Sequence, residues 1–274
     1  ISCRCLLPLL LLASLLVSQP TQCQPDVDTL VLLHSKLQSP SRNPIYPAVL
    51  QCPCSQAMKK RAPEQFSVSF VTQYGSFAAH CVRARAPVWV DRVYNLAQNG
   101  YFTQNYMFRI IPGKYVQFGT AGNPMVSNVY NYTSTQDPEC AILEPQPPDM
   151  PYCLAGAEQG RACGDVHKLS NVFGTISMST SVKSTAEFPG GVTWNATAEL
   201  FINLGNNSHL DDMLFVPICT IEGMSTVLKF PSFGEVTELG GPGVSLGLLY
   251  QDGNVYIESN QSWATMAKTS SVQV

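Results

Sequence analysis

The chain has 274 residues, of which 45% are hydrophobic and only 13% are charged, and its net charge is −3 at pH 7. This length suggests one or two domains, and the apolar content suffices for a packed core. Charged residues are rarer than the roughly 25% typical of soluble domains. A weakly acidic chain has no electrostatic reason to bind nucleic acid or an anionic membrane surface.

Residues 1–23 are predicted to be a secretory signal peptide. Arg4 is the only charge before an apolar run from Cys5 to Val17, and Thr21 and Cys23 are small residues that suit a cleavage site. The run is too short to span a bilayer, which needs about 20 residues. The alternative is an uncleaved amphiphilic anchor. Because the chain begins at Ile1 rather than Met, we expect that its first residues are missing.

Sequons and cysteines agree with the secretory pathway. Four N-x-S/T sequons occur, at Asn131, Asn195, Asn206 and Asn260. Of ten cysteines, three lie within 1–23, and the remaining seven are an odd number, so at least one thiol is free or pairs with another chain. For Cys52-Pro53-Cys54 we favour structural disulfides over a metal or redox pair, because no histidine is near. The chain ends without a retention tetrapeptide, which favours export over retention in the endoplasmic reticulum.

Residues 24–65 are predicted to be an N-terminal extension or linker. They contain a short helical pattern of leucines, a polar Ser-Pro-Ser-Arg stretch and the basic run Lys59-Lys60-Arg61. We interpret the basic run as solvated linker, with a protease site as the alternative.

A β-rich domain is predicted from residue 66 to residue 274. Residues 66–82 alternate as in a strand hairpin that turns at Tyr74-Gly75. Pro87 begins a helix that Asn99-Gly100 ends. Further strands are predicted at Met107–Ile111, Tyr115–Phe118, Gly174–Met178, Ala198–Leu204, Phe215–Ile221 and Asn254–Ile257, and a second helix at Gly223–Phe230. Many short strands and few helices indicate a mostly β protein, a barrel with capping helices.

A Pro- and Cys-rich segment interrupts this pattern at about residues 137–168. It holds five prolines together with Cys140, Cys153 and Cys163. Loops this long without periodicity are uncommon unless they are functional or tied down. We therefore expect a surface insertion held by disulfides.

The most informative stretch is residues 107–119, which read MFRIIPGKYVQFG. Two short apolar runs flank a Pro-Gly turn, and Arg109 and Gln117 are polar positions in an otherwise apolar segment. This stretch resembles the signature of the cyclophilin-type peptidyl-prolyl isomerases. Further motifs in that family's order are Thr72–Phe77, Ala86–Leu96, Asn99–Phe102, Ser170–Met178, Leu200–Asp211, Glu222–Met224 and Gly253–Tyr256. The resemblance implies a closed antiparallel β-barrel of about eight strands capped by two helices.

The resemblance also implies roles for individual residues. Arg109 would direct its guanidinium at the substrate proline, Gln117 would hold the substrate backbone and Arg109, and Phe201 would floor the proline pocket. A donor aimed at the prolyl nitrogen stabilises the twisted amide, whose rotation barrier is about 18–20 kcal/mol. The other expected substrate-binding residues are Phe108, Tyr115, Met178, Ser179, Thr180, Glu199, His209, Leu210 and Ile218, of which Met178, Leu210 and Ile218 would be pocket walls.

The implied activity is isomerisation of X–Pro bonds in polypeptides during protein folding. It needs no metal, nucleophile or cofactor. The expected partners are proline-containing polypeptides and, weakly, cyclosporin-type ligands. No nucleic acid and, after signal removal, no membrane is expected as a partner.

Four positions depart from the family's usual residues. Lys114 replaces an aromatic residue, Glu199 replaces glutamine, and His209 stands where one subgroup has tryptophan. The predicted polar loop Ser179-Thr180-Ser181 replaces Ala-Asn or a small variant. Glu199 loses an amide donor and is expected to pair with Arg109 or Lys114. We therefore expect the pocket to bind proline but to turn over more slowly than typical members.

Other chemistry is disfavoured by the sequence. Residues 243–247 match the G-x-S-x-G nucleophile elbow, but no histidine follows Ser245, so we interpret this match as chance. The four histidines share no metal-ligand spacing. Three functions remain: a secretory-pathway isomerase, a catalytically weak or inactive module that binds proline-containing segments, and a disulfide-tied surface or matrix scaffold.

Overall fold

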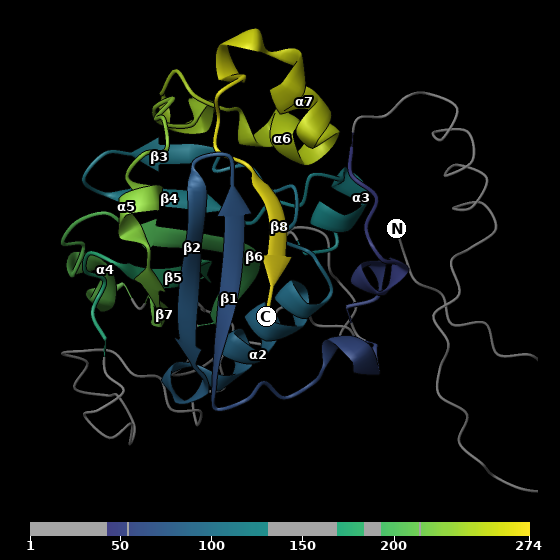
Figure 1. The fold of residues 1–274 in the computed structure, drawn as a ribbon, viewed down its shortest axis with the longest axis vertical. Coiled ribbons are helices and arrows are strands. Elements are labelled where there is room, and N and C mark those ends of the chain that lie inside the picture. The colour runs from purple at the N-terminus through teal and green to yellow at the C-terminus, as the bar shows by residue number, and fades with distance from the viewer. Residues whose placement is uncertain (1–42, 54, 131–168, 184–192, 214) are drawn as a thin grey trace, which may run out of the picture. The chain divides into compact units, whose positions relative to one another are not determined.

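The computed structural model describes residues 43–53, 55–130, 169–183, 193–213 and 215–274; the predicted signal peptide and the Pro/Cys-rich insertion lie outside them. In the described chain, eight strands form one antiparallel sheet in the order β3-β4-β6-β5-β7-β2-β1-β8 (Figure 1). The strands are β1 Gln65–Thr72, β2 Gly75–Val82, β3 Arg109–Ile111, β4 Tyr115–Phe118, β5 Thr175–Lys183, β6 Thr193–Asn203, β7 Pro217–Glu222 and β8 Thr269–Gln273.

The predicted first hairpin and first helix are confirmed. Strands β1 and β2 pair from Gln65 opposite Val82 to Thr72 opposite Gly75. Alternate residues of β1 are buried, as the two-residue period of a strand requires. Helix α2 (Pro87–Gln98) has its proline in the first turn and packs against β6 and β8 (Figure 1).

The sheet is an open half-barrel whose edge strands are β3 and β8. The segment before β3 is joined to residues 267–269 by three backbone hydrogen bonds, from Met107 N to Ala267 O at 2.8 Å, from Gln104 N to Thr269 O at 2.9 Å and from Thr269 N to Asn105 O at 2.9 Å. An isolated bridge between Tyr106 and Lys268 lies among them. The predicted eight-stranded antiparallel β architecture is therefore present, but the predicted closure of the barrel is not shown as a continuous ladder.

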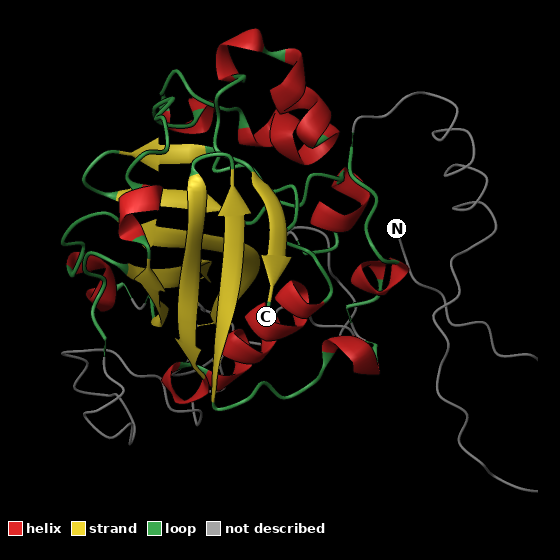
Figure 2. Ribbon diagram, in the orientation of Figure 1, coloured by secondary structure: helices red, strands yellow, loops and turns green. Residues whose placement is uncertain are grey.

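The C-terminal third differs from the sequence prediction. Asn254–Ile257, predicted as a strand, belongs to helix α7, and the last strand is β8. Four residues with two apolar positions fit either element, and burial of Ile257 in a cluster with Trp263 selects the helix. The predicted helix at Gly223–Phe230 is shorter. Besides α2, the helices in Figure 2 are α3 Pro124–Ser127, α4 His209–Asp212, α5 Met224–Val227, α6 Leu246–Asp252 and α7 Asn254–Ser259, with 3-10 turns at Ala48–Gln51, Gln56–Met58, Arg83–Arg85, Thr237–Leu239 and Gln261–Trp263.

Two apolar clusters form the core. The larger one lies between the sheet and α2 and includes Leu50, which is fully buried although it precedes the first strand. The smaller cluster contains Phe108, Val236, Val244, Leu249, Ile257, Trp263 and Met266. It anchors the segment that carries α6 and α7 to the residue before β3. This anchoring matters for the site, because it holds residues 231–244 beside β3.

The segment before β1 also packs on this unit. The Tyr46 hydroxyl donates to Thr103 O over 2.8 Å and accepts from Gly122 N over 3.0 Å.

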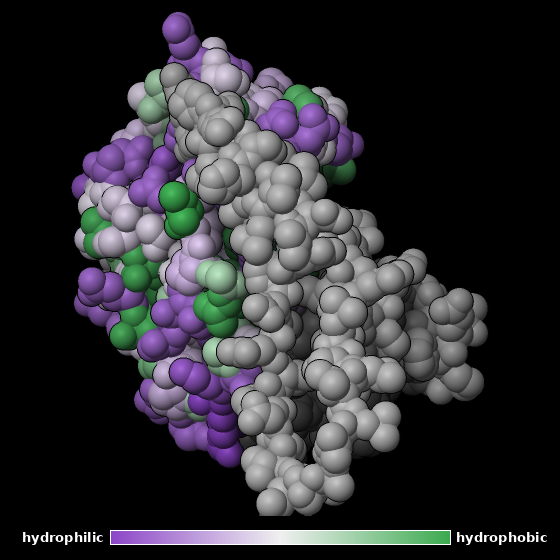
Figure 3. Space-filling view, turned by 90° about the vertical axis from the view of Figure 1, so that its right-hand side faces the viewer, coloured by the Kyte–Doolittle hydropathy of each residue, from purple (hydrophilic) through white to green (hydrophobic). Residues whose placement is uncertain are grey.

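On the face in Figure 3, hydrophobic side chains of the described part lie in small groups among hydrophilic ones. No helix in the described ranges has the length and apolarity that crossing a bilayer requires.

The disulfide bonding expected from the sequence is present at one pair of cysteines, which the sequence did not specify. Cys81 on β2 and Cys219 on β7 are bonded, with Cα atoms 4.0 Å apart. They are directly opposite one another in the ladder between these strands. The bond therefore links two neighbouring strands whose residues are 138 positions apart in the chain.

Candidate active site

The three predicted catalytic residues lie on adjacent strands. Arg109 on β3 is opposite Gln117 on β4, and Gln117 is opposite Phe201 on β6. Residues directly opposite one another in a ladder project to the same face of a sheet. The sheet thus brings these three side chains together in a row at its β3 edge.

The guanidinium of Arg109 is held from three sides. Its Nη1 donates to Gln117 Oε1 over 2.9 Å, and its Nη2 donates to Glu235 Oε2 over 2.7 Å. The ring of Tyr115 lies 4.8 Å from the guanidinium carbon, a cation–π distance. Only 17% of the Arg109 side chain is exposed, so these contacts are partly shielded from water, which strengthens electrostatic interactions.

Glu199 is the second carboxylate of the site, and it is buried. It does not pair with Arg109 or Lys114 as expected but accepts from Gln117 Nε2 over 2.7 Å. It also accepts from the Tyr250 hydroxyl over 2.5 Å and from Thr120 Oγ1 over 3.1 Å. Burial raises the pKa of Glu199, although these three hydrogen bonds and the charge of Arg109 oppose the shift.

Phe201 is covered by two aromatic neighbours. Its ring lies 6.2 Å from that of Tyr115 and 5.7 Å from that of Phe215, both in edge-on geometry. Phe201 is 7% exposed. The predicted pocket floor thus presents a small part of its ring between Tyr115 and Phe215.

Three expected substrate contacts are in the core instead. Met178 is opposite Leu200 and fully buried with it, so it faces away from Phe201, whose partner is Ser177. Ile218 is also fully buried in the larger cluster, and Phe108 packs in the smaller one. The alternation of strand residues accounts for Met178 and Phe108, because each is next in sequence to a residue of the site face.

The predicted polar loop after Met178 is part of a strand. Strand β5 continues to Lys183, and its register against β6 shifts between Met178 and Thr180. The backbone carbonyl of Ser179 accepts from Thr197 Oγ1 over 3.2 Å. The side chain of Thr180 lies outside the described part of the chain. The bulge at Ser179 is therefore where this strand departs from regular pairing.

A buried amide network positions α4 beside the site. Asn171 Nδ2 donates to Asp211 Oδ1 over 2.7 Å, and Asn207 Nδ2 donates to Asn203 Oδ1 over 2.8 Å. Asn207 Nδ2 also donates to the carbonyl of Lys114 over 2.7 Å, which ties the residues before α4 to the β3–β4 turn. The predicted contacts His209 and Leu210 lie on α4, His209 exposed and Leu210 half-buried.

Glu235, Tyr250, Thr120 and Phe215 were missed by sequence reasoning. Glu235 lies 126 positions from Arg109, and no local pattern marks it as a partner. Only its acidic character was readable from the sequence. The roles of all four residues depend on tertiary contacts that a single sequence does not reveal.

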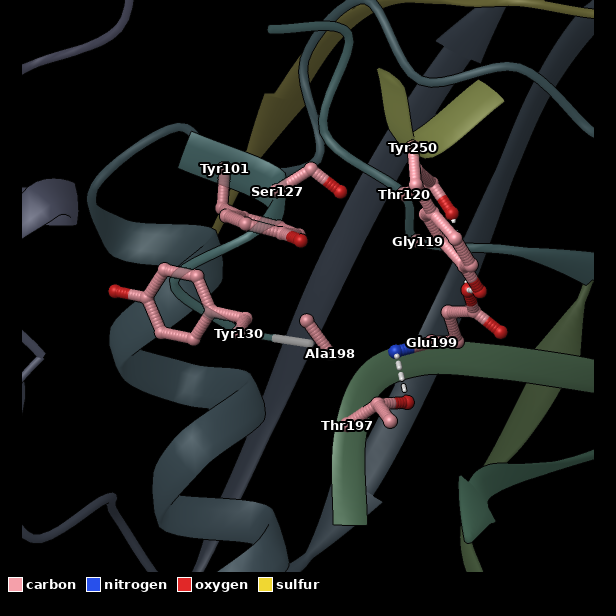
Figure 4. A pocket seen from close by; sticks show the side chains of 9 residues that line it. All are labelled: Tyr101, Gly119, Thr120, Ser127, Tyr130, Thr197, Ala198, Glu199 and Tyr250. Atoms are coloured by element: carbon pink, nitrogen blue, oxygen red, sulfur yellow. Dashed lines mark hydrogen bonds between the residues drawn. The ribbon is translucent and has the colours of Figure 1, made fainter. Parts of the chain in front are cut away.

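A small pocket with a volume of about 10 Å³ lies beside Glu199 (Figure 4). Its lining includes Tyr101, Ser127, Tyr130 and Tyr250 but not Arg109, Gln117 or Phe201. Gly119 borders it with φ +107°, and a Cβ there would lie 2.5 Å from Ala198 O. Glycine is therefore required where the end of β4 approaches β6. The pocket meets the site at Glu199 and at its hydrogen-bond partners Thr120 and Tyr250.

Ser245, the central serine of the G-x-S-x-G match, lies at the start of a helix. Ser245 is the N-cap of α6: its Oγ accepts from Leu248 N and donates to Glu238. This accounts for the G-x-S-x-G match as a helix start. The described residues contain no group of three or more His, Cys, Asp or Glu side chains able to hold a metal ion.

The fold and site define a β half-barrel with an arginine-centred row of side chains at one sheet edge. A family model described as cyclophilin type peptidyl-prolyl cis-trans isomerase/CLD matches residues 67–240. The chain belongs to the cyclophilin-type peptidyl-prolyl cis-trans isomerase family, as the resemblance implied.

Solved structures similar to the chain include a Cryptosporidium parvum cyclophilin type peptidyl-prolyl cis-trans isomerase. The identity is 13% and the TM-score 0.41, with 76% of this chain and 96% of that chain covered. A second structure of that enzyme, in the presence of the dipeptide Ala-Pro, has 13% identity and a TM-score of 0.40, covering 76% of this chain and 98% of that chain. No curated protein matches the chain.

Proposed function

We propose that this chain binds proline-containing segments of polypeptides beside Arg109, Gln117 and Phe201 and isomerises their X–Pro bonds. The observation that carries the proposal is a partly buried guanidinium that Gln117 holds in a row with an aromatic floor. Family membership supports the same activity. Assistance of protein folding is the physiological role that we propose for it.

The chemistry suits such a site. Rotation about an X–Pro bond is opposed by amide resonance, and the uncatalysed exchange takes tens of seconds or longer. A fixed donor near the prolyl nitrogen favours the twisted amide, in which that nitrogen regains its lone pair. The donor stabilises the transition state more than the planar substrate, which is the requirement for catalysis.

The second candidate function is a module that binds proline-containing segments with little or no turnover. The contact between Arg109 and Glu235 favours it, because that carboxylate neutralises the charge that the reaction uses. Cyclosporin-type ligands are proposed to bind weakly, since the site carries the charged Lys114 and the exposed His209.

The deciding experiment measures isomerisation of an Ala-Pro-containing peptide by exchange NMR for the wild type, R109Q and the control R61Q. Arg61 is an exposed arginine that also pairs with a glutamate, Glu64. Loss of turnover in R109Q alone, with an unchanged thermal midpoint, supports the isomerase. Saturable peptide binding without turnover, lost in R109Q, supports the binding module. If the wild type shows no turnover and no peptide binding, both the isomerase and the binding module are overturned, and the scaffold function remains.

We further propose that the chain resides in the secretory pathway and is glycosylated. The Cys81–Cys219 bond suits an oxidising compartment, and the sequon residue Asn206 is exposed. The test is mass spectrometry of the chain secreted by cultured eukaryotic cells. An unmodified Asn206 in secreted material would count against glycosylation, and full retention in the cytosol would count against the compartment.

A further inference from the structure

We propose that Glu235 occupies the edge of Arg109 that a prolyl substrate uses, and that it thereby limits both substrate affinity and turnover at this site. The inference rests on the proposed function. It assigns a rate- and affinity-determining role to a residue on the segment after α5, outside the strands that carry Arg109, Gln117 and Phe201.

The carboxylate covers one whole edge of the guanidinium. Glu235 Oε1 lies 2.5 Å from Arg109 Nε, and Glu235 Oε2 accepts from Nη2 over 2.7 Å. Nη2 therefore forms a hydrogen bond with the carboxylate, whereas Nε is in close ion-pair contact with it without hydrogen-bond geometry. With Nη1 donating to Gln117, only the second hydrogens of Nη1 and Nη2 are left for a substrate. A substrate group that approaches Arg109 at the edge formed by Nε and Nη2 must therefore displace Glu235.

Glu235 is presented by an anchored segment. Gly234 forms an isolated bridge with Ile110 on β3, and Ser232 Oγ donates to Ile110 O over 2.5 Å. Gly234 has φ +89°, a backbone conformation that favours glycine. On the other side of Glu235, Val236 is fully buried in the smaller apolar cluster. The backbone of Glu235 is thus held beside β3, within reach of Arg109.

The surroundings keep the carboxylate charged. Burial opposes ionisation, but the hydrogen bonds from Arg109 and from Val236 N and the charges of Arg109 and Lys114 lower the pKa of Glu235. Lys114 is the other cation near Glu235, on the β3–β4 turn. A displaced Glu235 carboxylate could therefore move toward Lys114 and remain paired.

The test variant is E235Q, which keeps the side-chain size but removes the charge. The matched control is E64Q, which removes the charge of a glutamate that pairs with the exposed Arg61, far from Glu235 in the sequence. An uncharged amide competes less well than a carboxylate for a guanidinium. We expect E235Q to raise kcat/KM for an Ala-Pro-containing peptide, and to tighten its Kd, by about tenfold or more, a change typical of one charge-assisted hydrogen bond. E64Q should match the wild type.

A direct readout accompanies the kinetics. Nitrogen-15 NMR of the Arg109 Nε–H should show slow solvent exchange in the wild type and faster exchange in E235Q. If E235Q fails to fold, E235D, which keeps the charge but shortens the reach by one methylene, should give a smaller rise in the same direction. If R109Q abolishes the wild-type turnover but E235Q and E235D leave it unchanged, the role inferred for Glu235 is overturned and the proposed function stands. Absence of turnover and of peptide binding in all variants overturns the proposed function as well.

Discussion

Gln117 donates its amide nitrogen to Glu199 Oε2 over 2.7 Å while its amide oxygen accepts from Arg109. A carboxylate can only accept and a guanidinium can only donate, so Glu199 and Arg109 together fix which end of the Gln117 amide faces Arg109. A residue that departs from the family's usual glutamine thus orients a group of the site through a hydrogen bond and not through an ion pair with Arg109.

Replacing Glu199 by alanine should reduce isomerisation about tenfold or more, because the Gln117 amide loses the partner that orients it. E199Q should retain more activity, since its amide oxygen can still accept from Gln117. The measurement is kcat/KM with an X–Pro peptide, with thermal midpoints recorded for each variant. Equal activity of E199A and wild type would show that the orientation of Gln117 does not depend on Glu199.

Removing the hydroxyl of Tyr250 should destabilise the native state by about 1–3 kcal/mol. Y250F leaves the buried Glu199 with two side-chain donors, Gln117 and Thr120, in place of three. The check is urea denaturation of wild type and Y250F. Y74F is the control, because the Tyr74 hydroxyl donates to the Thr265 carbonyl in an exposed setting. A loss in Y250F no larger than in Y74F would contradict the prediction.

The dependence of stability on pH should carry two opposite contributions. Burial opposes the ionisation of Glu238, but hydrogen bonds from Gly247 N and Leu246 N lower its pKa from 4.5 to about 2. Its contribution is therefore complete above pH 4.5 and is lost as the pH falls toward 2. The raised pKa of Glu199 has the reverse effect: its contribution is complete below pH 4.5 and is lost as the pH rises through its folded value.

Thermal midpoints between pH 2 and pH 7 test both signs. E238Q should flatten the acidic limb of the profile, modestly because Glu238 is exposed and solvent screens it. E199Q should flatten the decline above pH 4.5. A stability profile for E238Q that parallels the wild-type profile from pH 5 to pH 2 would rule out the contribution of Glu238. A steeper decline of stability above pH 4.5 in E199Q than in the wild type would rule out the contribution of Glu199.

Reducing the Cys81–Cys219 bond should lower the free energy of unfolding by about 2–4 kcal/mol, because the bond closes a long loop in the unfolded chain. Urea denaturation with and without dithiothreitol measures the loss. In the double variant C81A/C219A, the same reductant should have a smaller effect. Unchanged stability of the wild type on complete reduction of this bond would contradict the expectation.

Substituting Ser245 by alanine should cost about 1 kcal/mol of stability and no catalytic activity. Ser245 Oγ caps the N-terminus of α6, and typical N-cap replacements have this effect. The check pairs thermal unfolding with an ester-hydrolysis assay of wild type and S245A. Serine-dependent hydrolysis by the wild type would contradict the helix-cap interpretation.

Several elements were readable from local sequence pattern because their determinants are local. The alternating residues of the first hairpin and the Pro87 and Asn99-Gly100 signals of α2 gave the correct elements. Pattern failed at Asn254–Ile257, where two apolar residues in four fit a strand or a helix equally. The last strand, β8, was missed because Thr269–Gln273 is mostly polar and its pairing with β1 is long-range.

By itself, the sequence determined the family and the β-rich architecture, and it predicted Arg109, Gln117 and Phe201 as the centre of the site, since short motifs in the family's order carry that information. The tertiary structure alone decided what surrounds them. Strand alternation placed Met178 and Phe108 in the core. Folding brought Glu235 to Arg109 and Tyr250 to Glu199. These contacts depend on packing between residues far apart in the chain, and electrostatic pairing across such separations leaves no periodic trace in the sequence.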